Sequence, residues 1–259
     1  SNRAIQNLLP DHRGVSAPMW SHQPQHTSSG THTFLHYMDN KQNYYDTNLV
    51  NQEIISYGPT YVDLEVTSIS GDNKVKFTYN HIEMPDTDEN RAYYVMKYEF
   101  LEDLSISSVK NDLYFYSVGS NTGSPYLKMG WLDENNQSKI ATFAEVPNGT
   151  IYVLGNECPY FDLFDHGSNN DYGNVSMLIS NYEVVINGEK VDAPLAIYKA
   201  SGSLRLTLDL DDVTFKAGDT ISINAIIMPW GSQESDYSGV NYAPDQNVRD
   251  VRENTLLNP

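Results

Sequence analysis

The chain has 259 residues, of which 39% are hydrophobic and 12% aromatic, so it is long enough to bury a sizeable core. Its 16 basic and 34 acidic residues give a net charge of −18 and a pI of about 4.5. Such a negative field repels phosphate backbones and anionic lipids, which excludes nucleic-acid binding as a main function and disfavours membrane surfaces.

The residue types are those of an extracellular chain. It is acidic, poor in Lys and rich in Asn, and its single Cys158 excludes an internal disulfide and the Cys-rich zinc modules. No apolar run reaches the roughly 20 residues of a membrane-spanning helix. Because the chain begins with Ser1 instead of Met, we expect a processed product or a piece of a larger multidomain protein. The composition thus predicts a secreted protein without membrane insertion.

Tyrosine is the commonest aromatic residue, with 19 Tyr against 8 Phe. A tyrosine ring has an apolar body and a polar hydroxyl, so a Tyr-rich sheet can present aromatic surface that still makes hydrogen bonds. Such a surface suits sugars or protein partners. The alternative is that the tyrosines reflect only the high propensity of Tyr for strands.

Residues 1–30 show no sustained hydrophobic period and contain breakers at Pro18 and Pro24. They are predicted to form an irregular N-terminal arm anchored by Trp20. From residue 31 onward, short runs with β-type patterns follow one another, separated by turn signals. The predicted strands are 32–38, 53–57, 60–69, 74–84, 91–104, 112–118, 126–131, 139–144, 150–154, 174–180, 183–187, 194–199, 203–210 and 219–228.

Several of these runs alternate strictly between apolar and polar residues. In 74–84, for example, Val75, Phe77 and Tyr79 alternate with Lys76 and Thr78. This alternation indicates antiparallel sheets with one buried and one wet face. The fold is therefore predicted to be all-β, a large antiparallel β-sandwich of supersandwich type with little helix. We expect one sandwich domain over 31–259; the alternative is two smaller sandwiches with a boundary in 155–174.

A family resemblance rests on four segments. The sequences GPTYV at 58–62, VKFTY at 75–79, NRAYY at 90–94 and LEDL at 101–104 resemble the strand pattern of mutarotase-like β-supersandwich domains. Such domains occur in carbohydrate-active enzymes, including polysaccharide lyases and some glycosidases. The resemblance covers less than a fifth of the chain and implies a role connected with glycans. It transfers no catalytic residue, because no specific catalytic motif accompanies it.

One constellation could carry acid–base chemistry. Tyr79, His81 and Glu83 are two residues apart, which places them on the same face of one strand. If the next segment closes a hairpin, Arg91 comes near Glu83. Glu83 would then orient His81, and Arg91 would hold an anionic or hydroxyl-rich ligand. In a lyase, Tyr79 or His81 would transfer the proton and Arg91 would neutralise the substrate carboxylate. The alternative is a structural polar cluster at the rim of the sandwich.

The loop between these two segments has the spacing of oxygen ligands that begins a calcium loop. Asp86, Asp88 and Asn90 occupy alternate positions. An EF-hand is excluded because Arg91 stands where that motif requires Gly. A calcium site of another type is one hypothesis, and a solvated acidic turn is the other.

Aromatic and histidine side chains at two places are candidate sugar contacts. Trp20 and His22 lie in the N-terminal arm, where a histidine could contribute to a cleft beside the indole. Trp230 follows Pro229, which ends a strand, and Tyr237 lies in the polar stretch beyond it. Rings on a sandwich rim can stack on the apolar faces of sugars. Trp230 as a core plug is the alternative.

The sequence contains no G-x-S-x-G, P-loop, G-x-G-x-x-G or H-E-x-x-H motif. Their absence excludes ATPases, dinucleotide-dependent oxidoreductases and standard serine hydrolases. We therefore predict an extracellular carbohydrate-binding domain of a glycan-processing protein. Two alternatives stay open: a polysaccharide lyase or related glycan-active enzyme, and an extracellular assembly or adhesion domain that forms homo-oligomers.

Overall fold

The protein is an antiparallel β-sandwich, as the alternation predicted. The computed structural model describes residues 8–10, 20–22, 32–38, 47–58, 61–84, 91–119, 128–156, 159–164, 174–201 and 203–230. Helix in these residues is confined to α1 (Val109–Asp112) and the 3-10 turn η1 (Phe143–Glu145). Neither segment has the length or the apolar character of a membrane span. The predicted all-β class with little helix is confirmed.

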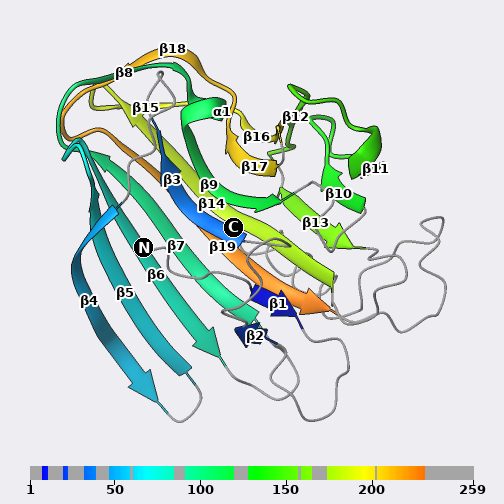
Figure 1. Ribbon diagram of the computed structural model, residues 1–259, viewed down its shortest axis with the longest axis horizontal. Coiled ribbons are helices and arrows are strands. Elements are labelled where there is room, and N and C mark those ends of the chain that lie inside the picture. The colour runs from blue at the N-terminus through cyan, green and yellow to red at the C-terminus, as the bar shows by residue number, and fades with distance from the viewer. Residues whose placement is uncertain are drawn as a thin grey trace.

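A ten-stranded sheet forms one layer (Figure 1). In spatial order its strands are β11 (Ser138–Thr142), β10 (Lys128–Leu132), β13 (Tyr160–Phe164), β14 (Asn174–Ile186), β19 (Thr220–Trp230), β7 (Arg91–Phe100), β6 (Val75–Met84), β5 (Tyr61–Ser70) and β4 (Thr47–Gly58). The tenth, β15 (Glu189–Val191), pairs with β14. We call this layer the large sheet.

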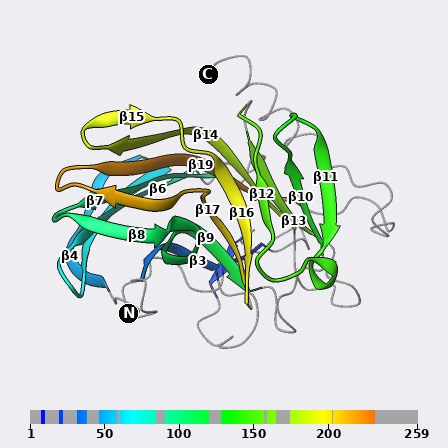
Figure 2. The same ribbon diagram turned by 90° about the horizontal axis from the view of Figure 1, so that it is seen from above.

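A five-stranded sheet, the small sheet, forms the second layer (Figure 2). Its order is β12 (Ile151–Val153), β16 (Leu195–Ala200), β17 (Ser203–Leu208), β9 (Leu113–Gly119) and β3 (His32–Tyr37). Two further antiparallel pairs complete the described chain: β8 (Leu104–Ser108) with β18 (Asp211–Phe215), and β1 (Leu8–Pro10) with β2 (Trp20–His22).

Several strand boundaries differ from the predicted ones. The predicted strands 174–180 and 183–187 are one strand, β14, whose pairing with β19 shifts register between Ile179 and Asn181. The predicted strand 53–57 is part of the longer β4, and 91–104 divides into β7 and β8. In β14 and β4 a register shift interrupts the side-chain alternation without ending the backbone pairing. The bend after Phe100 does end β7, and β8 begins at Leu104.

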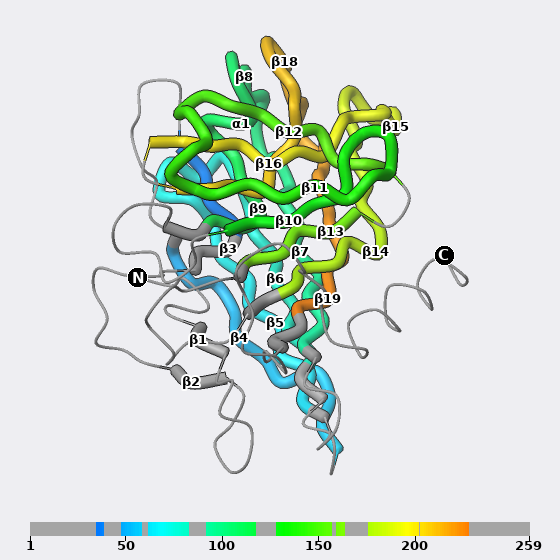
Figure 3. The backbone as a smooth tube through the Cα atoms, turned by 90° about the vertical axis from the view of Figure 1, so that its right-hand side faces the viewer, coloured from blue at the N-terminus to red at the C-terminus, as the bar shows by residue number. Residues whose placement is uncertain are grey.

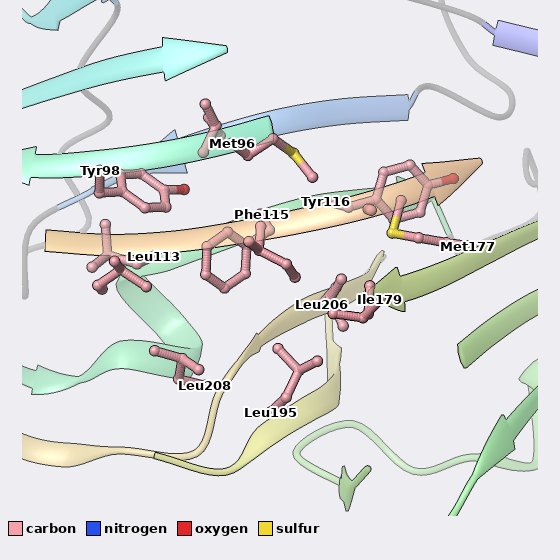
Figure 4. Close-up of a cluster of buried hydrophobic side chains, with 14 of the residues drawn as sticks. Met96, Tyr98, Leu113, Phe115, Tyr116, Met177, Ile179, Leu195, Leu206 and Leu208 are labelled. Carbon is pink, nitrogen blue, oxygen red and sulfur yellow. The ribbon is translucent and has the colours of Figure 1, made fainter. Parts of the chain in front are cut away.

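The core fills the space between the two sheets. Side chains from facing strands meet there, as Figure 4 shows for Met96 and Tyr98 of β7, Phe115 of β9 and Leu206 of β17. The alternate residues of β6 and β7 supply the large-sheet side: Val75, Phe77, Tyr79, Tyr94, Met96, Tyr98 and Phe100. The intervening residues of these strands lie on the opposite face, which we call the outer face.

Candidate functional site

The predicted residues Tyr79 and His81 lie on the same face of β6, directed toward the core. The His81 and Tyr94 rings stack with centroids 4.8 Å apart and planes at 14°, and the Tyr79 and Tyr94 centroids are 5.5 Å apart. Tyr79 is buried within the hydrophobic core, whereas His81 is half-buried at its margin. The pair thus forms one aromatic cluster with Tyr94, and its catalytic role stays a prediction.

The other two members of the predicted acid–base set occupy different register positions. β6 and β7 are neighbouring antiparallel strands, so the predicted hairpin partner is correct. Glu83 is paired with Ala92, however, and Arg91 with Met84. The backbone register therefore does not make Glu83 and Arg91 cross-strand partners. Their side chains lie outside the described residues, as do any contacts between them.

The remaining predicted site residues are described only in part. Asp86, Asp88, Asn90 and Tyr237 lie outside the described residues, so the calcium loop stays a prediction. For three others the backbone pairing alone is described: Trp20 and His22 in β2, and Trp230 at the end of β19. Within the part of the chain that the structure describes, no group of three or more His, Cys, Asp or Glu is arranged to hold a metal ion.

A different set of polar side chains gathers on the outer face of the large sheet. Asn80 of β6 and Asn224 of β19 both pair with Val95 of the intervening β7. Two residues along β7, Tyr93 pairs with Ile82 and Ile226 in the same way. Tyr93 is therefore a diagonal neighbour of both asparagines, at a spacing that long and aromatic side chains can bridge. Its ring is half-buried.

Carboxylates from β5 extend this set toward the sheet edge. Asp63 pairs with Ile82, and Glu65 pairs with Asn80. The Oδ1 atom of Asp63 is buried and has no hydrogen-bond partner among the described residues. Leaving a buried acceptor unsatisfied costs on the order of 1–3 kcal/mol. Because this oxygen is closed to solvent, a ligand hydroxyl reaches it only when the Asp63 side chain turns outward. We call Asp63, Glu65, Asn80, Tyr93 and Asn224 the outer-face site.

Two ion pairs lie on the same face as the outer-face site. Lys76 Nζ lies 3.2 Å from Glu99 Oε2 in a cross-strand ion pair on the same face. Glu183, which neighbours Ser222 on that face, forms an ion pair with Lys190. The site therefore offers amides, carboxylates and one aromatic ring without a cluster of cations among the described residues. Such a set binds neutral hydroxyl-bearing ligands better than polyanions.

This site was not predicted from the sequence, because Tyr79, His81 and Glu83 lie on the face that alternation assigned to the core. A signal was nevertheless present: Tyr93 occupies the same alternate positions as Arg91, Lys97 and Glu99, where an aromatic ring is out of place. No comparable signal in the sequence indicates Asp63, because its place in the site depends on which strand lies beside β6.

Comparison with known proteins gives similarities in structure only. No protein-family model matches the sequence, and no curated protein matches it. Similar solved structures include the GH36 alpha-galactosidase AgaA from Geobacillus stearothermophilus, at 10% identity over 77% of this chain and 30% of that chain, with a TM-score of 0.46. AgaB from the same organism has 9% identity over 85% and 34%, with a TM-score of 0.45.

The alpha-galactosidase from Lactobacillus brevis shows 10% identity over 89% of this chain and 34% of its own, with a TM-score of 0.40. The chain thus spans 30% to 34% of the length of these enzymes.

Proposed function

We propose that this chain is a carbohydrate-binding domain of a secreted glycan-processing protein, and that it holds a neutral glycan at the outer-face site. The observation that carries the proposal is the half-buried Tyr93 on the outer face, with Asn80 and Asn224 as diagonal neighbours on the two flanking strands. Asp63 lies one strand farther out, beyond Ile82. The apolar face of a sugar can cover the ring, while amides and carboxylates bond its hydroxyls and fix its orientation.

The charge of the chain favours a neutral ligand. With a net charge of −18, the protein repels a highly anionic polysaccharide from a distance. No cationic cluster among the described outer-face residues offsets that repulsion. Lys76 and Lys190 are engaged in ion pairs, and Lys97 lies singly between Thr78 and Ser222. A neutral glycan avoids this repulsion and still uses every acceptor of the site.

A glycan array followed by calorimetric titration of a bound glycan tests the proposal. Replacing Tyr93 with Ala is expected to weaken binding about tenfold or more, because loss of about 1.4 kcal/mol corresponds to a factor of ten. Tyr57→Ala is the matched control, since it removes an exposed ring on the other face of the sheet. Unchanged affinity in Tyr93→Ala, or equal losses in both variants, would contradict the assignment. Repeating the array with EDTA tests the calcium loop at Asp86, Asp88 and Asn90.

Asp63 gives a second, sharper prediction because its effects on binding and on stability have opposite signs. In Asp63→Ala, the ligand loses a carboxylate acceptor and affinity should fall several-fold. The free energy of unfolding should stay the same or rise by up to about 1 kcal/mol, because the variant removes a buried oxygen that has no partner. Chemical denaturation beside the titration measures both. A marked loss of stability would show that Asp63 has a structural role instead.

A further inference from the structure

Strand β4 forms one edge of the large sheet, as the left side of Figure 1 shows. It has 12 residues and, among the described residues, pairs only with β5. Within the part of the chain that the structure describes, its other side therefore presents a row of backbone N–H and C=O groups without strand partners. A long edge of this kind is a template for pairing with another extended strand.

The side chains of β4 do not block such pairing. Proteins usually protect an edge with Lys, Pro, a β-bulge or a very short strand. Strand β4 contains no Lys, Arg or Pro and only one charge, at Glu53, and its two register shifts lie outside residues 51–54. Its large apolar side chains are between 47% and 79% exposed: Leu49, Val50, Ile54, Ile55 and Tyr57. The opposite edge, β11, is different, since it has only five residues and carries Lys139, whose Nζ lies 3.3 Å from Asp133 Oδ2.

The exposed side chains of β4 include a continuation of the core face. One row of paired residues crosses four neighbouring strands on this face. It consists of Ile54 of β4, Leu64 of β5, His81 of β6 and the buried Tyr94 of β7. Along this row Ile54 is exposed, Leu64 and His81 are half-buried, and Tyr94 is buried. Figure 3 shows β4 and β5 running past the level of the small sheet. The edge thus combines free backbone groups with apolar surface that the small sheet does not cover.

We infer that β4 pairs antiparallel with β4 of a second copy of this chain, joining two large sheets across a two-fold axis. When the two-fold axis is perpendicular to the sheet, one residue of β4 lies opposite the same residue of the second copy. The choice of this central residue decides which other side chains of the two strands face each other. Centring on Gln52 puts Glu53 opposite Asn51 and Ile54 opposite Val50. Centring on Glu53 would oppose two carboxylates, which is destabilising.

Three observations favour a second copy as the occupant. Strand β4 carries a single charge in a chain whose net charge is −18, so two copies repel each other little where their β4 strands meet. Asn51 Nδ2 already donates to Glu53 Oε2 at 3.2 Å along the strand, and the Gln52-centred register lets the same groups bond across the interface. The register shifts of β4, between Leu49 and Asn51 and between Ile54 and Ser56, leave the central stretch 51–54 regular, and Val50 lies in the first shift.

The oligomeric state of the whole chain tests the inference. Light scattering after size exclusion should give twice the 29.2 kDa of one chain, with a dimer fraction that rises with protein concentration. The fraction should also rise with salt, because salt screens the repulsion between two copies of like charge. A wild-type chain that stays monomeric at its highest soluble concentration, in low and high salt, overturns the inference.

Matched variants locate the interface. Ile54→Lys should give a monomer, since an edge Lys opposes strand pairing. Ile140→Lys makes the same change at a 44% exposed position on β11 and should leave the dimer intact. Circular dichroism should show both variants folded, because both positions are exposed. A dimer that persists in Ile54→Lys, or is lost equally in Ile140→Lys, overturns the inference.

A cysteine at the predicted centre tests the register. Opposed residues of antiparallel strands have Cα atoms about 4.5–5.5 Å apart, within disulfide range. Gln52→Cys in a Cys158→Ala background should therefore give a covalent dimer under a mild oxidant. Asn48→Cys is the control, because its counterpart in the second copy lies about 26 Å away in this register. Equal cross-linking of the two variants overturns the register. None of these results depends on glycan binding.

Discussion

Replacing Asp219 with Ala is expected to lower the free energy of unfolding by about 3–5 kcal/mol. The buried carboxylate of Asp219 accepts hydrogen bonds from the backbone N–H groups of Asn187 at 2.8 Å, Gly188 at 2.9 Å and Lys216 at 2.7 Å. It thereby joins the turn between β14 and β15 to the turn that precedes β19. The variant leaves three donors without their acceptor, and chemical denaturation measures the loss.

The same residue should make stability depend on acid. Burial raises the pKa of Asp219, but the three backbone hydrogen bonds together lower it by more than burial raises it. The pKa of Asp219 is therefore below its usual value. A lowered pKa in the folded state adds stability above the unfolded value of about 3.9, and this stability is lost as the pH falls below it. Between about pH 5 and pH 3, stability should fall less steeply in Asp219→Asn than in the wild type.

The control for both experiments is Glu189→Ala, which removes an exposed acid from the neighbouring β15. It should change stability by less than about 0.5 kcal/mol. Equal pH slopes in the wild type and Asp219→Asn would contradict the assignment of the acid-sensitive term to Asp219.

Replacing Tyr98 with Phe should cost about 2–3 kcal/mol, although it removes one oxygen atom. The hydroxyl of Tyr98 accepts a hydrogen bond from the His36 N–H at 2.9 Å and lies 3.0 Å from the His36 carbonyl oxygen. It can also donate to the carbonyl oxygen of Tyr114. Because Tyr98 is in the large sheet and its partners are in the small sheet, the hydroxyl connects the two layers. Its burial also raises the pKa of Tyr98 well above the usual value.

Thermal and chemical denaturation of Tyr98→Phe measure this cost. Tyr57→Phe is the matched control, since it removes the hydroxyl of an exposed tyrosine and should leave stability within about 0.5 kcal/mol of the wild type. If both variants unfold at the same denaturant concentration as the wild type, the hydrogen bonds of Tyr98 contribute no net stability.

Local patterns predicted much of this fold. The alternation of Val75, Phe77 and Tyr79 indicated their burial, and the structure confirms it. An Asn-Gly pair such as Asn187-Gly188 favours a tight turn, and both residues have positive φ, at 55° and 76°, between β14 and β15. Such predictions succeed because side-chain alternation and turn conformation depend on a few adjacent residues.

The candidate sites were less accessible to prediction. Tyr79 was proposed for proton transfer because it precedes His81 and Glu83 on one strand face, yet it is buried in the core. The sequence contains no pattern that assigns Asp63 to a site, because its position beside Ile82 depends on the pairing of β5 with β6. Spacing along one strand identifies a shared face, but not what covers that face.

The sequence alone determined the class of the fold, the inward and outward faces of its strands and several of its turns, because these follow from local backbone geometry. Only the tertiary structure decided which strands are neighbours: β7 pairs with β19 from the far end of the described chain, which places Tyr93 beside Asn224. It also decided that β4, and not another strand, lies at the long edge. Strand order depends on how two whole layers pack together, and no short segment encodes that packing.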